Sequence, residues 1–135
     1  MRIVLDTNVV VSGLLSAVTP PGRVIESVYA GELTVLHDER VLDEYAAVLA
    51  RPRFGFTPED IAWFMAMMDY GESVVAPPLP LTVPDESDLK FIEVAVAGGA
   101  DAIVTGNVKD FRIAEGRLAI PVVSPRRLVE LMRGR

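Results

Sequence analysis

Three acidic residues lie at positions where their carboxylates could bind a divalent cation. Asp6 follows the apolar run at residues 3–5, which is typical of a buried strand, and Asp88 lies in the first turn of a predicted helix. Glu44 falls at the edge of the apolar face of another predicted helix, where a buried carboxylate needs a cation or a metal as its partner. Carboxylates that share a pocket repel one another and raise one another's pKa, and a divalent ion relieves that repulsion.

A second apolar run, at residues 102–104, is also followed by small polar residues. Thr105, Asn107 and Asp110 come after this run, as Asp6 comes after the first. If the two strands are neighbours in a parallel sheet, Asn107 and Asp6 project into the crevice at the carboxyl ends of the strands, where open α/β sheets bind ligands. Oxygen ligands, in a chain with no cysteine and one histidine, suit Mg²⁺ or Mn²⁺.

Several of these residues also have a structural interpretation. Asp6 or Asn8 could cap the helix that follows the first strand. Glu44 could extend from the edge of its helix into solvent. His37, the only histidine, sits at the end of a predicted strand, which favours a structural role over that of a general base.

The other acidic residues have ordinary alternatives as well. Asp85 as a cap and Asp88 in the first turn would complement the dipole of the helix they open. Asn107 could belong to a turn, with Asp110 as a local cap. No one of these signals is specific, so the hypothesis of a metal site depends on their convergence.

Apolar runs that alternate with helical patterns predict an α/β fold in which a parallel sheet is covered on both faces. We expect strands at residues 3–5, 33–36, 73–75, 102–104 and 120–123. We expect helices at residues 9–15, 23–29, 38–50, 57–70, 87–98 and 124–132, and a loop with at most one helical turn at 106–116. The length of 135 residues favours a single domain spanning 1–135.

The charge distribution limits the classes of partner. A formal net charge of −6 argues against a protein that coats nucleic acid. Residues 109–135 nevertheless hold seven basic and three acidic residues, which allows a local phosphate contact and equally a plain solvated surface. The absence of cysteine fits a cytoplasmic location, and we expect no signal peptide and no membrane span.

Four segments together resemble the PIN-domain family, in particular the VapC-like toxin ribonucleases of toxin–antitoxin pairs. They occur in family order and at family-like spacing over nearly the whole chain. The segments are Ile3-Val4-Leu5-Asp6-Thr7-Asn8, Leu42-Asp43-Glu44-Tyr45, Asp85-Glu86-Ser87-Asp88-Leu89-Lys90-Phe91 and Ile103-Val104-Thr105-Gly106-Asn107-Val108-Lys109-Asp110-Phe111. The resemblance implies a three-layer α/β/α fold around a central parallel sheet of four to five strands.

The resemblance also implies an endoribonuclease that hydrolyses RNA phosphodiester bonds with Mg²⁺ or Mn²⁺. The residues it implies are the acids Asp6, Glu44, Asp88 and Asp110, the metal ligand Asn107 beside the first three, and the supporting residues Thr105 and Asn8. Many members have Asp where this chain has Asn107, which is a neutral ligand. The number of bound ions is therefore left open.

Two other functions fit the same residues. Mg²⁺-dependent phosphohydrolases of small molecules also place Asp after a first strand, but they typically have Asp-x-Asp-x-Thr, and this chain has Asn8 in place of the second Asp. A binding module that keeps the fold with little or no catalysis is suggested by Asn107.

The partners implied by the resemblance are an RNA substrate and a cognate antitoxin protein, with no membrane. The predicted helix at 57–70 is apolar over most of its circumference, so it is either deeply buried or part of a subunit interface. That helix offers a surface for the antitoxin or for a homo-oligomer, a dimer or larger.

Overall fold

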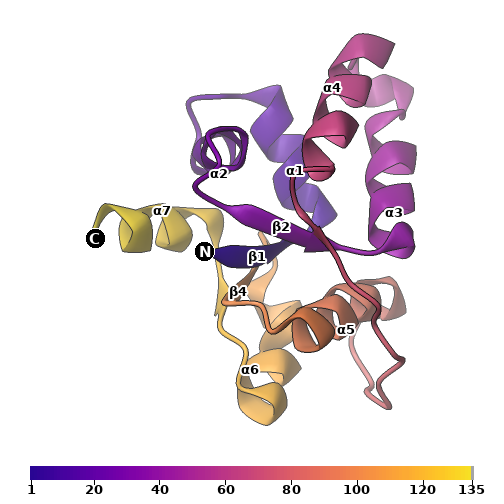
Figure 1. The fold of residues 1–135 in the computed structure, drawn as a ribbon, viewed down its shortest axis with the longest axis vertical. Coiled ribbons are helices and arrows are strands. Elements are labelled where there is room, and N and C mark those ends of the chain that lie inside the picture. Colours follow the sequence, from indigo (N-terminus) through magenta and orange to yellow (C-terminus); the bar gives the residue numbers. More distant parts are fainter. Residues whose placement is uncertain (135) are drawn as a thin grey trace.

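A parallel sheet of five strands forms the centre of the protein (Figure 1). The computed structural model describes residues 1–134. The strands are β1 (Arg2–Leu5), β2 (Thr34–His37), β3 (Glu72–Ser73), β4 (Ala102–Val104) and β5 (Val122–Val123). Their order in the sheet is β3-β2-β1-β4-β5, so the direction of strand addition reverses between β1 and β4. Open α/β sheets bind ligands at such a switch point.

Residues 3–5 of β1 and all of β4 are apolar because helices cover both faces of these central strands. Ile3, Val4 and Leu5 of β1 are fully buried, as are Ile103 and Val104 of β4. Leu5 pairs with Val104 in the parallel register, so the two strands end side by side. The first residues after each strand therefore meet at one edge of the sheet.

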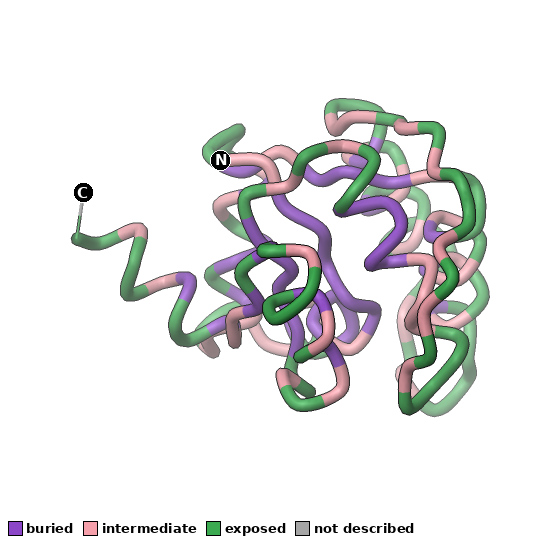
Figure 2. Tube along the Cα trace, turned by 90° about the horizontal axis from the view of Figure 1, so that it is seen from below, coloured by how far each residue is buried: buried purple, intermediate pink, exposed green. Residues whose placement is uncertain are grey.

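The helices occupy both sides of the sheet. The α-helices are α1 (Thr7–Leu15), α2 (Pro20–Tyr29), α3 (Glu39–Leu49), α4 (Pro58–Met68), α5 (Leu89–Gly98), α6 (Arg112–Leu118) and α7 (Pro125–Arg133), and the 3₁₀ helices are η1 (Pro52–Phe54), η2 (Glu86–Asp88) and η3 (Val108–Phe111). In Figure 1, α1 to α4 lie above the sheet, and α5 and α6 lie below it. Figure 2 shows the buried residues gathered along the central strands and the inner sides of these helices. The three-layer α/β/α expectation is confirmed.

Capping residues set the beginnings of several helices, as their sequence predicts. The side chain of Asp38 accepts a hydrogen bond of 3.1 Å from the backbone N–H of Val41, at the start of α3. Thr57 and Asp60 form a reciprocal capping box at the start of α4. Pro at the first positions of α2 places the beginning of that helix at Pro20, three residues earlier than the expected 23.

The expectation of a loop at residues 106–116 is wrong. The segment folds as η3 and then α6, which ends at Leu118 with Ala119 in the left-handed conformation (φ 56°). Phe111 and Ala114 are fully buried. They follow helical spacing, but the helix is short and Gly116 interrupts its pattern, so burial stabilises a segment with weak helical propensity.

The apolar helix α4 is not deeply buried. Phe64 and Met68 are fully buried, whereas Trp63 is 62% exposed on the opposite side. An apolar surface is thus left on α4, and Tyr70, just after the helix, is also exposed. Within residues 1–134, no helix has the length and hydropathy needed to cross a membrane.

Candidate active site

Asp6 lies at the switch point of the sheet, directly after β1. It occupies the N-cap position of α1, but its side chain makes no capping hydrogen bond, so the capping interpretation of Asp6 is wrong. Its Oδ2 instead accepts a 2.7 Å hydrogen bond from the hydroxyl of Thr105, which follows β4. The same hydroxyl oxygen accepts a 2.9 Å hydrogen bond from the backbone N–H of Asn107. The ends of β1 and β4 are therefore joined through the side chain of Thr105.

Burial raises the pKa of Asp6, whose side chain is almost covered, and the Thr105 hydrogen bond counteracts that effect. Asn8 supports the same junction, since its Oδ1 accepts a 3.2 Å hydrogen bond from the backbone N–H of Gly106. The carboxylate of Asp6 is thus partly desolvated, and one of its oxygens accepts a hydrogen bond from a neutral hydroxyl. A bound cation would stabilise its ionised form.

Glu44 reaches the same region from α3. Its Oε2 accepts a hydrogen bond from the hydroxyl of Thr7, the residue after Asp6. The next residue on the helix, Tyr45, is fully buried and donates a hydrogen bond to the backbone carbonyl of Leu5 at the end of β1. Two consecutive residues of α3 therefore bind Thr7 and Leu5, the residues on either side of Asp6, which explains why Glu44 lies beside Asp6.

The partner of Glu44 is a lysine. Its Oε1 lies 2.6 Å from Nζ of Lys90 on α5, and the side chains are 26% and 13% exposed, respectively. The interpretation in which Glu44 extends freely into solvent is therefore wrong. Sequence analysis anticipated a cation or a metal at this carboxylate but did not identify Lys90.

Asp88 carries the clearest electrostatic signal of a shared site. It is half-buried at the end of η2, and its pKa is raised to about 7 by burial, the largest cause, together with the charges of Asp6, Asp85, Asp110 and Glu44, in that order. The charges of these acids, which come from four different segments, all act on one carboxyl group. A divalent cation beside such acids would lower the energy of their ionised forms, and the metal site formed by these residues stays a prediction.

Asn107 and Asp110 lie on the segment that follows β4. The backbone N–H of Asp110 donates a 3.0 Å hydrogen bond to the carbonyl of Asn107, so Asn107 begins a turn as the structural interpretation expects, but Asp110 lies within η3 and not at its cap position. They also line a surface hollow of about 420 Å³ together with Lys109 and Arg112. Acidic and basic groups thus lie next to each other at the rim of the site.

The donor chemistry of this region fits a hard divalent cation, because every candidate ligand offers oxygen. Within residues 1–134, however, no three histidine, aspartate or glutamate side chains stand close enough together to hold one ion as they lie. Glu44 faces Lys90, and Asp6 faces Thr105. To share one ion, the carboxylates have to move closer together, which Asp6 can do while its Oδ2 keeps the hydrogen bond from Thr105.

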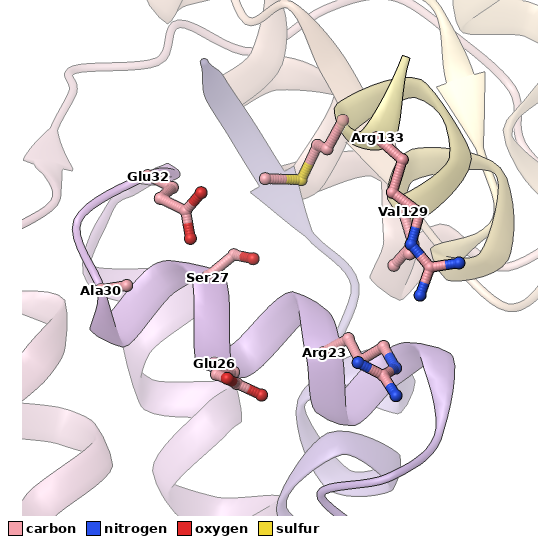
Figure 3. A pocket seen from close by; sticks show the side chains of 8 residues that line it. Arg23, Glu26, Ser27, Ala30, Glu32, Val129 and Arg133 are labelled. Atoms are coloured by element: carbon pink, nitrogen blue, oxygen red, sulfur yellow. The ribbon is translucent and has the colours of Figure 1, made fainter. Parts of the chain in front are cut away.

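Other candidates lie outside this cluster. His37 ends β2 and is buried, and its Nε2 lies 2.8 Å from the backbone carbonyl of Met68, so it is bound to the end of α4. A separate hollow of about 260 Å³ lies between α2 and α7 (Figure 3). Arg133 lines it with Arg23, Glu26 and Glu32, away from all the predicted site residues. The basic C-terminal segment is thus divided between two surfaces, and Arg135 lies outside the described residues.

Sequence reasoning missed Lys90 and Thr7, which both contact Glu44. Lys90 had a signal that could have revealed it. A basic residue in the first turn of a helix opposes the helix dipole, and such a residue requires a compensating partner. An acid was therefore the expected partner of Lys90, but the sequence alone could not choose Glu44 over the acids at residues 85, 86 and 88.

Comparison with known proteins identifies one family. The chain matches the family model described as "PIN domain" over residues 2–109. That range includes β1 to β4 and the residues Asp6, Glu44, Asp88 and Asn107, but it ends just before Asp110. A search of curated proteins found no match.

Proposed function

This chain belongs to the PIN domain family, and we propose that it is a Mg²⁺-dependent endoribonuclease, the toxin of a toxin–antitoxin pair. PIN domains are generally nucleases, which supports hydrolysis of nucleic acid. The proposal is carried by the family match over residues 2–109 and by the position of Asp6 at the switch point between β1 and β4, and it is supported by the pKa of Asp88, which burial and four other carboxylates raise to about 7. A cluster of this kind is suited to a divalent cation that acts on a phosphodiester.

Each acid has a proposed role. Asp6 would bind the principal ion at the switch point, with Asp88, Asp110 and Asn107 as further ligands and Glu44 in contact directly or through water. When bound, a Mg²⁺ or Mn²⁺ ion would activate a water molecule and stabilise the charge that develops on the phosphate. Thr105 holds the orientation of Asp6 by its 2.7 Å hydrogen bond. Asn8 keeps the loop after β4 against the start of α1.

The rim of the site supplies positive charge for an RNA backbone. Lys109 and Arg112 line the hollow that also contains Asp110 and Asn107. We propose that these two side chains bind phosphates beside the cleaved bond, because such contacts position a nucleic acid without reading its sequence. The negative net charge of the chain limits that contact to a local one.

The toxin assignment also implies protein partners. The exposed apolar surface of α4, with Trp63, is the proposed contact for an antitoxin segment or for a second copy of this chain. Both partners remain part of the proposal, as does a cytoplasmic location.

The direct test is RNA cleavage by the purified protein with Mg²⁺, beside the variant Asp6→Asn. We expect loss of cleavage by at least about a hundredfold in the variant, since it removes an ionised group at the centre of the cluster. Equal cleavage by the two proteins would reject this site. A parallel assay with small phosphate esters separates the ribonuclease from a phosphohydrolase, which would cleave the esters and leave RNA intact.

A second candidate function is a PIN-fold binding module with weak or no catalysis. Two observations favour it: Asn107 is neutral where many family members have an acid, and Glu44 is already paired with Lys90. Calorimetric titration with Mn²⁺ distinguishes the two functions. A protein that binds RNA but takes up no Mn²⁺ would be such a module, and the nuclease proposal would be abandoned.

A further inference from the structure

We propose that Lys90 is a built-in cation of the acidic cluster, which holds Glu44 away from the metal so that the site binds one divalent ion and not two. The inference rests on the proposed function, because it concerns how that same site binds its ion. It changes the expected ligand set in one respect: Glu44 belongs to Lys90, and the ion belongs to Asp6, Asp88, Asp110 and the neutral Asn107.

The contacts of Lys90 are those of an anchored group. Its Nζ lies 2.6 Å from Oε1 of Glu44, and it also donates a hydrogen bond to the backbone carbonyl of Ser87. The same nitrogen lies 5.1 Å from the centroid of the Phe91 ring, within the range of a cation–π interaction. With its side chain only 13% exposed, the ammonium group is held from three sides.

The position of Lys90 on α5 is unfavourable by itself. A positive charge in the first turn of a helix opposes the dipole, at a typical cost of a few tenths of a kcal/mol or more. Glu44 compensates this cost from another element, because α3 brings its carboxylate to the end of β1. The ion pair therefore connects the helix that carries Glu44 to the helix that follows Asp88.

The charge of Lys90 acts on the rest of the cluster. Burial raises the pKa of Asp6, and Lys90 is among the groups that oppose this increase. With Glu44 neutralised and Asn107 uncharged, the acids left for metal ions are Asp6, Asp88 and Asp110. One divalent ion balances most of that charge, whereas a second ion would be repelled by both the first and the ammonium group.

The test is calorimetric titration with Mn²⁺ alone, at pH 7.5, of the wild-type chain and the variants Lys90→Gln, Lys90→Arg and the double variant Lys90→Gln/Glu44→Gln. We expect one ion per wild-type chain. Lys90→Gln should bind Mn²⁺ at least about tenfold more tightly or take up a second ion, because it removes a nearby positive charge and frees Glu44. Lys90→Arg keeps the charge and should behave like the wild type, and the double variant, which removes both charges, should return to one ion of wild-type affinity.

Arg127→Gln serves as the matched control, since it also removes one cation from an ion pair, with Glu130, but on the exposed surface of α7. Its Mn²⁺ affinity should stay within about threefold of the wild type. Circular dichroism melts confirm that each variant is folded.

The outcomes separate the two proposals. Two ions bound by the wild-type chain, or an unchanged titration of Lys90→Gln, would overturn the role of Lys90 and leave the nuclease proposal standing. No uptake of Mn²⁺ by the wild-type chain or by any variant would overturn the metal-dependent function, and the role of Lys90 with it.

Discussion

Replacement of Asp88 by Asn should stabilise the metal-free protein while it removes function. Burial and four neighbouring acids raise the pKa of Asp88 from 3.8 to about 7. The unfolded chain therefore releases this proton at lower pH than the folded chain does. Below pH 4 both states keep the proton, and the stability that this group contributes is lost as the pH rises to 7. Above pH 7 Asp88 is ionised in the folded state, where burial and the neighbouring acids disfavour its charge.

The magnitude follows from the size of the shift. A difference of roughly 3 pKa units corresponds to about 4 kcal/mol for a fully buried group. Asp88 is only half-buried, so solvent screens the interaction, and about 1–2 kcal/mol is the appropriate expectation. Asn is nearly isosteric with the protonated acid and cannot ionise. In a chain of this length the gain corresponds to an increase in melting temperature of roughly 3–8 °C at pH 8.

The assay is thermal or urea unfolding of the wild type, Asp88→Asn and the exposed control Asp43→Asn, in EDTA, between pH 4 and pH 8. The Asp88→Asn variant should match the wild type near pH 4 and exceed its stability increasingly up to pH 7, and the control should follow the wild type throughout. Added Mn²⁺ should stabilise the wild type more than the variant. A variant less stable than the wild type at pH 8 would refute the conclusion that Asp88 lies among like charges.

Three further predictions concern groups around the site. Thr105→Val removes the hydroxyl that donates to Asp6, so its Mn²⁺ affinity should fall by about tenfold with the fold retained, as measured by calorimetry and circular dichroism. Glu93→Gln removes the charge of an almost fully buried carboxylate that holds Arg40 at 2.6 Å; because Arg40 is half-exposed and also pairs with Asp38, urea unfolding should show a loss of about 1 kcal/mol, and an unchanged midpoint would show that the pair is not needed. Trp63→Glu should lower the mass seen by sedimentation if α4 is a self-association surface, and an unchanged mass would exclude that surface.

The central strands β1 and β4 were predictable because their burial leaves a simple pattern, whereas the edge strand β3 (Glu72–Ser73) shares only Ser73 with the strand expected at 73–75. The run at residues 102–104 is a strand at those same positions in the structure, since it is apolar throughout and ends in small polar residues. The helix α6 could not be predicted from the sequence in the same way. Its helical state depends on the burial of Phe111 and Ala114 against the rest of the chain, and a tertiary contact of this kind leaves little trace in seven residues with an internal glycine.

The geometry of the acids was only partly predictable. Strand order and periodicity place Asp6 and the residues after β4 at one edge of the sheet, because the carboxyl ends of adjacent parallel strands must meet there. They also place Glu44 at the rim of a buried face. The partner of Glu44 was not predictable by periodicity, because Lys90 belongs to a helix 46 positions further along and only the packing of α3 against α5 brings the two together.

The geometry of the site depends on how α3 packs against α5 in the core. Tyr45 packs against Phe91 with ring centroids 6.5 Å apart, and these two rings are neighbours in sequence of Glu44 and Lys90, respectively. The apolar contact therefore helps to set the distance at which the ion pair forms, and in our proposal the ion pair in turn leaves Asp6, Asp88 and Asp110 as the acids free for a cation. A substitution that loosens the two rings should change metal affinity without touching a single ligand, because it would move Lys90 and Glu44 relative to each other.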